Sequence, residues 1–134
     1  MSEPFFGPYI IGDGLYEPGT HQFLDALSWR CHRIIAERIR SDPSLLRIPR
    51  ANIARWLALD PYDEGEKRSV LEWLPMLEEA RLDELIARMT DPGEEGQRMR
   101  QSTPFVGILA QGERCAIRDQ MIEQWEHREK VQLA

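Results

Sequence analysis

The chain has 134 residues, of which 42% are hydrophobic and 30% are charged, and its net charge is −6. This hydrophobic content excludes a disordered tail, and the length suits one domain with its own core. No run of about 18 apolar residues is present to span a membrane. The first residues lack the basic cluster and apolar run of a secretory signal, so we expect a cytoplasmic protein.

Residues 1–19 are predicted to form an irregular arm ahead of a helical domain over residues 20–134. Glycine and proline recur through this arm and disfavour a helix. The arm also carries Phe5, Phe6 and Tyr9, and this makes it too apolar for a solvated tail. It must therefore pack either on its own helices or on a partner, and we expect the helical domain to fold without it.

Residues 21–40 are predicted to form a long helix. Their apolar side chains recur at the i, i+3 and i+4 spacing of one helix face, and Thr20 is a suitable N-cap. The following residues, SDPSLL, predict a break. Asp42 would be the next cap and Pro43 would take the first position of a second helix.

The rest of the chain also has a helical pattern, and no alternating run predicts a strand. Pro49 and Pro75 fall inside predicted helices and should kink or divide them, because proline has no amide hydrogen. We therefore predict an all-α, compact single domain of five or six short-to-medium helices. The later helices are expected at about residues 43–58, 65–80, 82–90, 93–102 and 111–130.

The stretch MRQSTPFVGIL, residues 99–109, joins two of these helices. Pro104 should end the preceding helix near Ser102. Phe105 and the aliphatic residues after it then predict a plug that fills the core between the helices. The alternative is that this stretch forms the edge of a partner-binding groove.

Residues with catalytic or metal-binding chemistry do not form a recognisable motif. The three histidines lack ligand spacing, and Cys31 and Cys115 each fall in a helical pattern typical of reduced core thiols. Glu72, between Leu71 and Trp73, is the nearest candidate for an isolated catalytic acid. We predict no catalytic, cofactor-binding or metal-binding residues. The histidines are His21, His32 and His127.

Charge is distributed unevenly along the chain. Residues 28–58 carry seven arginines against two acids, Glu37 and Asp42, which gives a local charge of +5, whereas residues 61–134 are acidic. Arginines that shared one face could contact phosphates, although the isoelectric point of about 5.1 argues against a dedicated nucleic-acid binder. The alternative is that they pair with acidic groups of the same chain. The candidates for a shared face are Arg30, Arg33, Arg40, Arg47, Arg50 and Arg55.

Three segments resemble a group of small bacterial all-helical antitoxin-like proteins, whose genes often stand beside a toxin-like gene. The segments are IIAERIRSDPSLLRIPRANIARWL, LEWLPMLE and GQRMRQSTPFVGILAQGER, and the resemblance covers about residues 32–114. The chain departs from the pattern at Pro49 and Pro75 and in its aromatic arm. The resemblance implies a protein partner, and no catalytic residue follows from it.

These observations together predict a non-enzymatic protein-binding module that neutralises or regulates a partner protein. The partner would be a toxin or another nucleic-acid-handling enzyme or defence complex, whose basic site an acidic surface can cover. Aromatic side chains and arginine are typical of interface hot spots. Open alternatives are a DNA-binding regulator that uses residues 28–58, a small enzyme whose site is assembled by the fold, and a homodimer. The predicted partner-binding residues are Phe5, Phe6, Tyr9, Trp29, Arg33 and Arg40.

Overall fold

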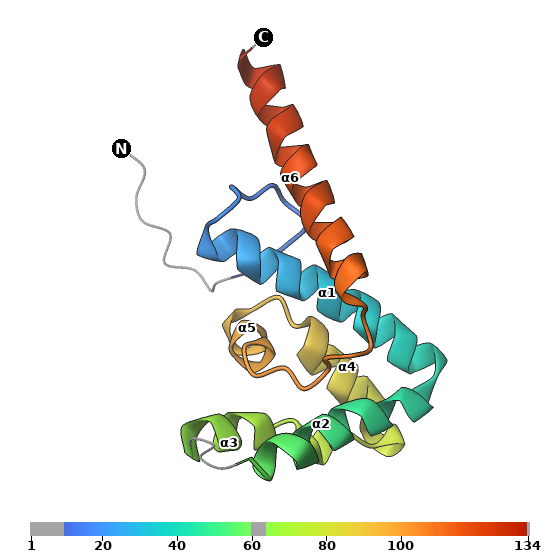
Figure 1. The fold of residues 1–134 in the computed structure, drawn as a ribbon. Helices are drawn as coiled ribbons and strands as arrows, with labels where there is room; N and C mark the ends of the chain where they lie inside the picture. Colours follow the sequence, from blue (N-terminus) through green and yellow to red (C-terminus); the bar gives the residue numbers. More distant parts are fainter. Residues whose placement is uncertain (1–9, 60–63, 134) are drawn as a thin grey trace.

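The computed structural model describes residues 10–59 and 64–133, and in these residues the chain is all-α (Figure 1). This confirms the predicted fold class. The six α-helices are α1 (His21–Ser41), α2 (Arg47–Leu57), α3 (Glu64–Leu71), α4 (Leu82–Thr90), α5 (Glu94–Arg100) and α6 (Gln111–Leu133). Three 3-10 turns complete the described secondary structure, namely η1 (Pro43–Leu46), η2 (Leu74–Met76) and η3 (Glu79–Arg81).

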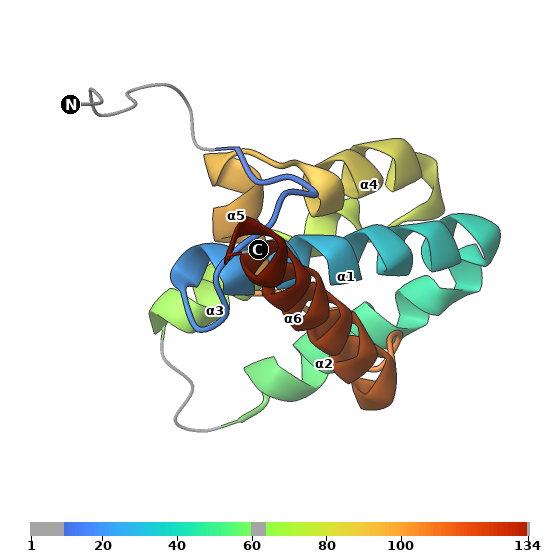
Figure 2. The same ribbon diagram turned by 90° about the horizontal axis from the view of Figure 1, so that it is seen from above.

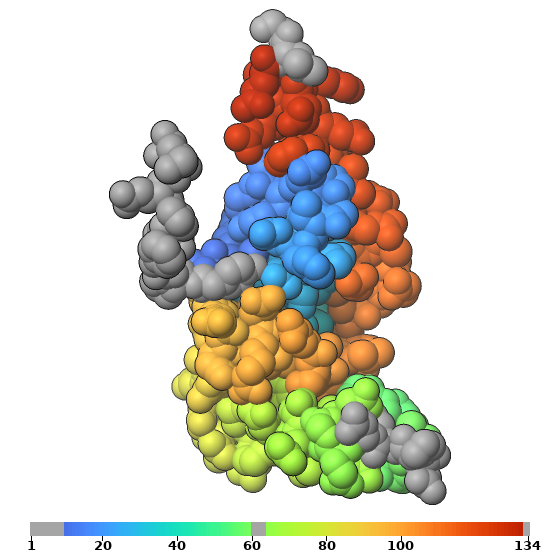
Figure 3. Space-filling model, turned by 90° about the vertical axis from the view of Figure 1, so that its left-hand side faces the viewer, coloured from blue at the N-terminus to red at the C-terminus, as the bar shows by residue number. Residues whose placement is uncertain are grey.

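Helix α1 is the element around which the others are arranged. It contacts α4, α5 and α6, and Figure 2 shows α4 running alongside it while α6 crosses it. Arg38 of α1 holds both carboxylate oxygens of Glu113 and so fastens the start of α6. The second half of α6 extends beyond the rest of the fold, as Figures 1 and 3 show.

Two helix starts form as predicted. The side chain of Thr20 accepts a hydrogen bond from the amide of Phe23 at 3.2 Å and caps α1. The side chain of Asp42 accepts one from the amide of Ser44 and caps η1, which has Pro43 in its first turn.

Pro49 and Pro75 have different effects on the predicted helices. The predicted second helix does come as two pieces, but the division lies between Leu46 and Arg47. Pro49 instead occupies the first turn of α2, where a missing amide hydrogen costs nothing. Pro75 interrupts the predicted helix over residues 65–80, which becomes α3, η2 and η3.

The core consists of two clusters of buried side chains. The larger lies among α1, α2, α4 and α5 and includes Trp73, Leu85 and Phe105. The smaller lies between α1 and α6 and includes Phe23 and Met121. Leu109 packs against both clusters and joins them.

The described part of the predicted arm belongs to this core. Ile11 is 2% exposed within the smaller cluster, and its amide donates a hydrogen bond to the carbonyl of Pro92 at 2.8 Å. A deletion of residues 1–19 would therefore remove the core packing of Ile11, and the folding of the helical domain without the arm stays a prediction. Residues 1–9 lie outside the described residues.

The stretch after α5 is the predicted plug. Phe105 is 1% exposed, and its ring makes edge-to-face contacts with Trp73 and His32, at centroid distances of 5.2 and 6.0 Å. The side-chain amide of Asn52 donates hydrogen bonds to the carbonyls of Pro104 and Val106 at 2.9 and 2.8 Å. These bonds fix the backbone on either side of the ring.

Replacement of this ring is expected to be costly. Phe105→Ala should lower the free energy of unfolding by about 3–5 kcal/mol, because it removes a fully buried ring and leaves a cavity. Val106→Ala is the matched control, since the adjacent Val106 side chain is 63% exposed and its loss should cost less than about 0.5 kcal/mol. Urea unfolding of both variants measures the difference, and equal losses would contradict the assignment of Phe105 to the core.

Gly96 allows α5 to lie directly against the turn that precedes it. A Cβ atom at Gly96 would overlap the carbonyl group of Asp91 and would lie 2.6 Å from the Asp91 Cβ. The same carbonyl accepts a hydrogen bond from Arg100 at 2.6 Å, so its position is constrained from two sides. A glycine is therefore needed here for close approach.

Two glycine-to-alanine changes are expected to have opposite effects. Gly96→Ala should destabilise the protein by about 1–3 kcal/mol because the new methyl group overpacks the turn. Gly112→Ala should stabilise it by up to about 1 kcal/mol, because Gly112 lies in the first turn of α6 with no heavy atom within 4 Å of the new methyl group. Thermal unfolding of both variants distinguishes a packing requirement from a general effect of glycine replacement.

Candidate partner-binding site

A groove of about 380 Å³ runs between α1 and α4. Trp29, Arg33, Ala36 and Arg40 fall on one face of α1, because residues three, four or seven positions apart on a helix are neighbours. Ile86 and Thr90 of α4 form the opposite wall. The groove is lined by Asp13, Trp29, Arg33, Ala36, Glu37, Arg40, Ile86 and Thr90.

Trp29 is fixed at one end of this groove. Its indole N–H donates a hydrogen bond to the carbonyl of Thr90 at 2.9 Å, which ties α1 to the last turn of α4. The Arg33 guanidinium lies over the Trp29 ring, 4.7 Å from the ring centroid. A cation held over an aromatic face and a satisfied N–H give a half-buried anchor of the kind found at interfaces.

The two arginines of the groove are paired with carboxylates from other segments. Arg33 Nη1 donates to both oxygens of Asp13 at 3.1 Å. Arg40 Nη1 donates to Asp83 at 3.2 Å. All four side chains are solvent-exposed, and exposed ion pairs contribute about 0–1 kcal/mol to stability.

The structure thus brings three of the six predicted partner-binding residues, Trp29, Arg33 and Arg40, into one groove. Their role in binding stays a prediction. Phe5, Phe6 and Tyr9 lie outside the described residues. The described chain begins near the Trp29 end of the groove, because Ile10 pairs with Gly93, three residues after Thr90.

Sequence reasoning missed the groove residues that lie outside α1. Ile86 and Thr90 reach the groove because α4 packs along α1, and Asp13 reaches it because Ile11 is anchored in the core. The helical pattern over residues 82–90 indicated which side of that helix is apolar. It carried no signal for the helix against which that side packs.

The arginines of residues 28–58 do not all share one face, and Arg33 and Arg40 are the two that line the groove. Each of the seven bonds to a group of the chain itself. Four of them pair with acids, as the alternative of internal pairing predicts, whereas Arg47, Arg50 and Arg55 bond to carbonyl or amide oxygens. Their partners come from several segments. They are Asp13 for Arg30 and Arg33, Glu113 for Arg38, Asp83 for Arg40, the Ser44 carbonyl for Arg47, the Leu77 carbonyl for Arg50 and Asn52 for Arg55.

Cys31 and Glu72 occupy environments that oppose catalytic roles. Cys31 is buried in the smaller cluster, and burial raises the pKa of its thiol, whereas a nucleophile needs a lowered one. Glu72 is exposed, and its hydrogen bonds to Arg98 hold its pKa below the ordinary value, so it stays ionised. Among the described residues, no three His, Cys, Asp or Glu side chains gather as a metal site would require.

His32 is a buried histidine that joins α1 to the plug. Its Nδ1 lies 2.7 Å from the carbonyl of Ser28, so Nδ1 carries the proton and Nε2 accepts from the Thr103 hydroxyl at 2.8 Å. Burial lowers the pKa of His32 to about 4. A base this weak is poorly matched to proton abstraction at neutral pH, and its bonds to α1 and to the loop indicate a structural role.

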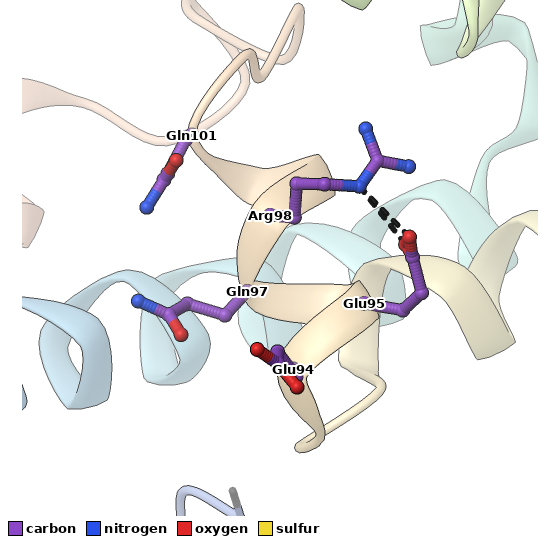
Figure 4. Close-up of a pocket in the computed structure, with 5 residues that line it drawn as sticks. All are labelled: Glu94, Glu95, Gln97, Arg98 and Gln101. Carbon is purple, nitrogen blue, oxygen red and sulfur yellow. Dashed lines mark hydrogen bonds and ion pairs between the residues drawn. The ribbon is translucent and has the colours of Figure 1, made fainter.

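The other hollows of the described surface include charged side chains, among them Arg98, which is paired with Glu72 and Glu95. One of about 840 Å³ lies among α2, α3 and the end of α5, with Trp56 and Thr103 in its lining. Another follows the outer face of α5. Figure 4 shows Gln97 and Gln101 on one side of that helix and the Glu95–Arg98 pair on the other. These side chains point away from one another and define no ligand position.

Comparisons with protein-family models, with curated proteins and with solved structures find no match to this chain. Across residues 10–59 and 64–133, no helix has both the length and the apolar character needed to cross a membrane. The groove between α1 and α4 is therefore identified from its own geometry.

The buried state of His32 predicts how stability depends on pH. The unfolded chain takes up a proton on His32 below about pH 6.5, whereas the folded chain takes it up only near pH 4. The free energy of unfolding should therefore fall by about 3 kcal/mol as the pH is lowered from about 6.5 to 4. Urea titrations across this range measure the loss.

His32→Gln is the control for this measurement, because glutamine cannot titrate. The variant should lose less stability between pH 6.5 and 4 than the wild type does. The pKa of Glu113 is lowered to about 2 mainly by its hydrogen bond to Arg38. Protonation of Glu113 should therefore lower the free energy of unfolding only below about pH 4.5, and in both proteins. Parallel pH profiles for wild type and variant would show that His32 is not the titrating group.

Proposed function

We propose that this protein is a non-enzymatic, cytoplasmic protein-binding module that neutralises or regulates a partner protein, as antitoxins and small protein inhibitors do. The observation that carries the proposal is the groove between α1 and α4. In it a fixed aromatic ring and two exposed arginines, Trp29, Arg33 and Arg40, lie together on one face of α1. Aromatic and arginine side chains dominate the binding energy of protein interfaces.

The N-terminal aromatic residues fit the same interface. Ile11 is held in the core beside Pro92, and Ile10 pairs with Gly93, so the chain enters the described fold near the Trp29 end of the groove. Phe5, Phe6 and Tyr9 precede this point by a few residues. A partner seated on the groove would therefore lie within reach of both sets of anchors.

The charge distribution suits a toxin or another enzyme that handles nucleic acid. The chain as a whole is acidic, and carboxylates outside the groove can take the place of phosphates opposite the Lys and Arg residues of such an enzyme. The net charge of −6 favours a protein partner over direct contact with DNA.

The proposal is tested by capture of the partner with matched variants. Tagged protein is co-expressed with the products of the adjoining genes, and bound protein is quantified. Combined replacement of Arg33 and Arg40 by alanine should lower the affinity for the partner by about thirtyfold or more, which corresponds to one hot spot. Deletion of residues 1–9 should also weaken binding, and it leaves Ile11 in the core.

Arg118→Ala is the control for the groove variants, because Arg118 is equally exposed on α6 and pairs with the neighbouring Asp119. Thermal unfolding should show that every variant remains folded. Full affinity in the Arg33 and Arg40 variant would place the interface elsewhere. Binding to DNA that weakens steeply with salt would favour a DNA-binding regulator, and turnover by the purified protein would favour an enzyme.

A further inference from the structure

The ion pairs of this protein fall into two geometric kinds. In three of them the arginine holds a carboxylate with two nitrogens, each bonded to a different oxygen. These are Arg38 with Glu113, Arg98 with Glu72 and Arg81 with Glu84. Such two-point pairing is the strongest arrangement of these groups and keeps both side chains in place.

The two groove arginines belong to the other kind, in which a single nitrogen reaches the acid, as in the Arg98–Glu95 and Arg118–Asp119 pairs. Within the described residues, Arg33 and Arg40 reach their carboxylates through Nη1 alone, at 3.1 and 3.2 Å. Their partners are also the more exposed members of the pairs, with 66% exposure for Asp13 and 92% for Asp83. An incoming carboxylate can therefore displace either acid at small cost and gain the two-point pairing that these arginines lack.

The positions of the two arginines fit a helix. Arg33 and Arg40 are seven residues apart on α1, which places them about 10 Å apart along the helix axis and on the same face. Ala36 lies between them and is buried, with Ile86 of α4 beside it in the groove. The groove thus presents a cation on either side of an apolar floor, and its lining also includes the acids Asp13 and Glu37.

We propose that this groove binds an acidic helix of the partner, in which two carboxylates two turns apart flank an apolar side chain. The inference rests on the proposed function and names the partner chemistry at the same site. The carboxylates would replace Asp83 on Arg40 and Asp13 on Arg33, and the apolar side chain would cover Ala36 and Ile86. Helix-in-groove binding uses this kind of spaced anchor.

The remaining acid of the groove favours a peptide over a nucleic acid. Glu37 is exposed on the same stretch of α1, four residues after Arg33 and three before Arg40. A continuous phosphate chain that reached both arginines would bring a phosphate close to Glu37, and like charges repel. A helix with two separate carboxylates and an apolar residue between them avoids this contact.

The test uses a synthetic probe, so that it does not depend on the natural partner. The probe is a fluorescein-labelled, helix-forming peptide with two glutamates two turns apart and a leucine between them. A matched peptide carries glutamine at both positions. Fluorescence polarisation should show at least about tenfold weaker binding of the glutamine peptide. Arg33→Gln and Arg40→Gln should each lower the affinity for the glutamate peptide by about tenfold.

Two further variants separate specific pairing from general charge. Asp83→Asn removes the carboxylate that competes for Arg40, so it should raise the affinity of the glutamate peptide by about two- to fivefold. Arg118→Gln removes an arginine of matched exposure, 47% against 45% for Arg33, and should leave affinity within about twofold. A rise in affinity on loss of Asp83 is a result that a purely structural role for these residues would not produce.

Three outcomes would overturn the inference. They are equal binding of the two peptides, no gain from Asp83→Asn, and displacement of the probe by a single-stranded oligonucleotide at the concentration at which the glutamate peptide displaces it. The first outcome together with a partner captured through Arg33 and Arg40 would leave the proposed function intact. Selective probe binding without any captured partner would support the acidic-helix site and contradict the proposed function.

Discussion

The fold depends on the contact of Phe105 with Trp73 and His32. Each of these three rings belongs to a different part of the chain, and together they close the space between α1, the break after α3 and the loop after α5. A hydrogen bond also helps to position each ring. Asn52 donates to the carbonyl of Pro104 beside Phe105, the Trp73 indole N–H donates to the carbonyl of Met99, and the Thr103 hydroxyl donates to His32. Short helices that are marginal alone become stable when they pack on such a centre.

This centre explains the interrupted course of the middle of the chain. Trp73 must point inward directly after α3, and its indole N–H must reach the end of α5. Pro75 ends the helical run at this point and allows the chain to turn through η2 and η3 before α4 begins. The interruption at Pro75 thus accompanies a defined packing contact.

Local signals in the sequence predicted most of the fold. Thr20 and Asp42 cap helices because a short polar side chain before an amphipathic run can accept a hydrogen bond from a free amide of the first turn. The bounds of α4 follow directly from its apolar spacing. The prediction of a break at Pro49 is wrong, because a proline is equally compatible with the first turn of a helix and the sequence does not show which of the two applies. The long-range hydrogen bond from Ile11 to Pro92 leaves no local pattern, so the sequence does not show on which of the two expected surfaces this part of the arm packs.

The candidate site was predictable only on the side of α1. The spacing of Trp29, Arg33 and Arg40 indicates a common face, but Ile86, Thr90 and Asp13 join them through tertiary packing. The basic segment illustrates the same limit. Of seven arginines close in sequence, Arg33 and Arg40 line the groove, whereas others bond elsewhere, as Arg38 does to Glu113.

The length of α6 has a consequence for the way this protein opens locally. Its first turns are fastened by Arg38 and by the side chains of Ile117 and Met121, whereas the residues from Glu126 to Gln132 are exposed. Amide hydrogens of the final turns are protected by the helix alone and those near Met121 by the folded core as well. Amide exchange with solvent deuterium will therefore be graded along one continuous helix, fast at its end and slow where it crosses α1.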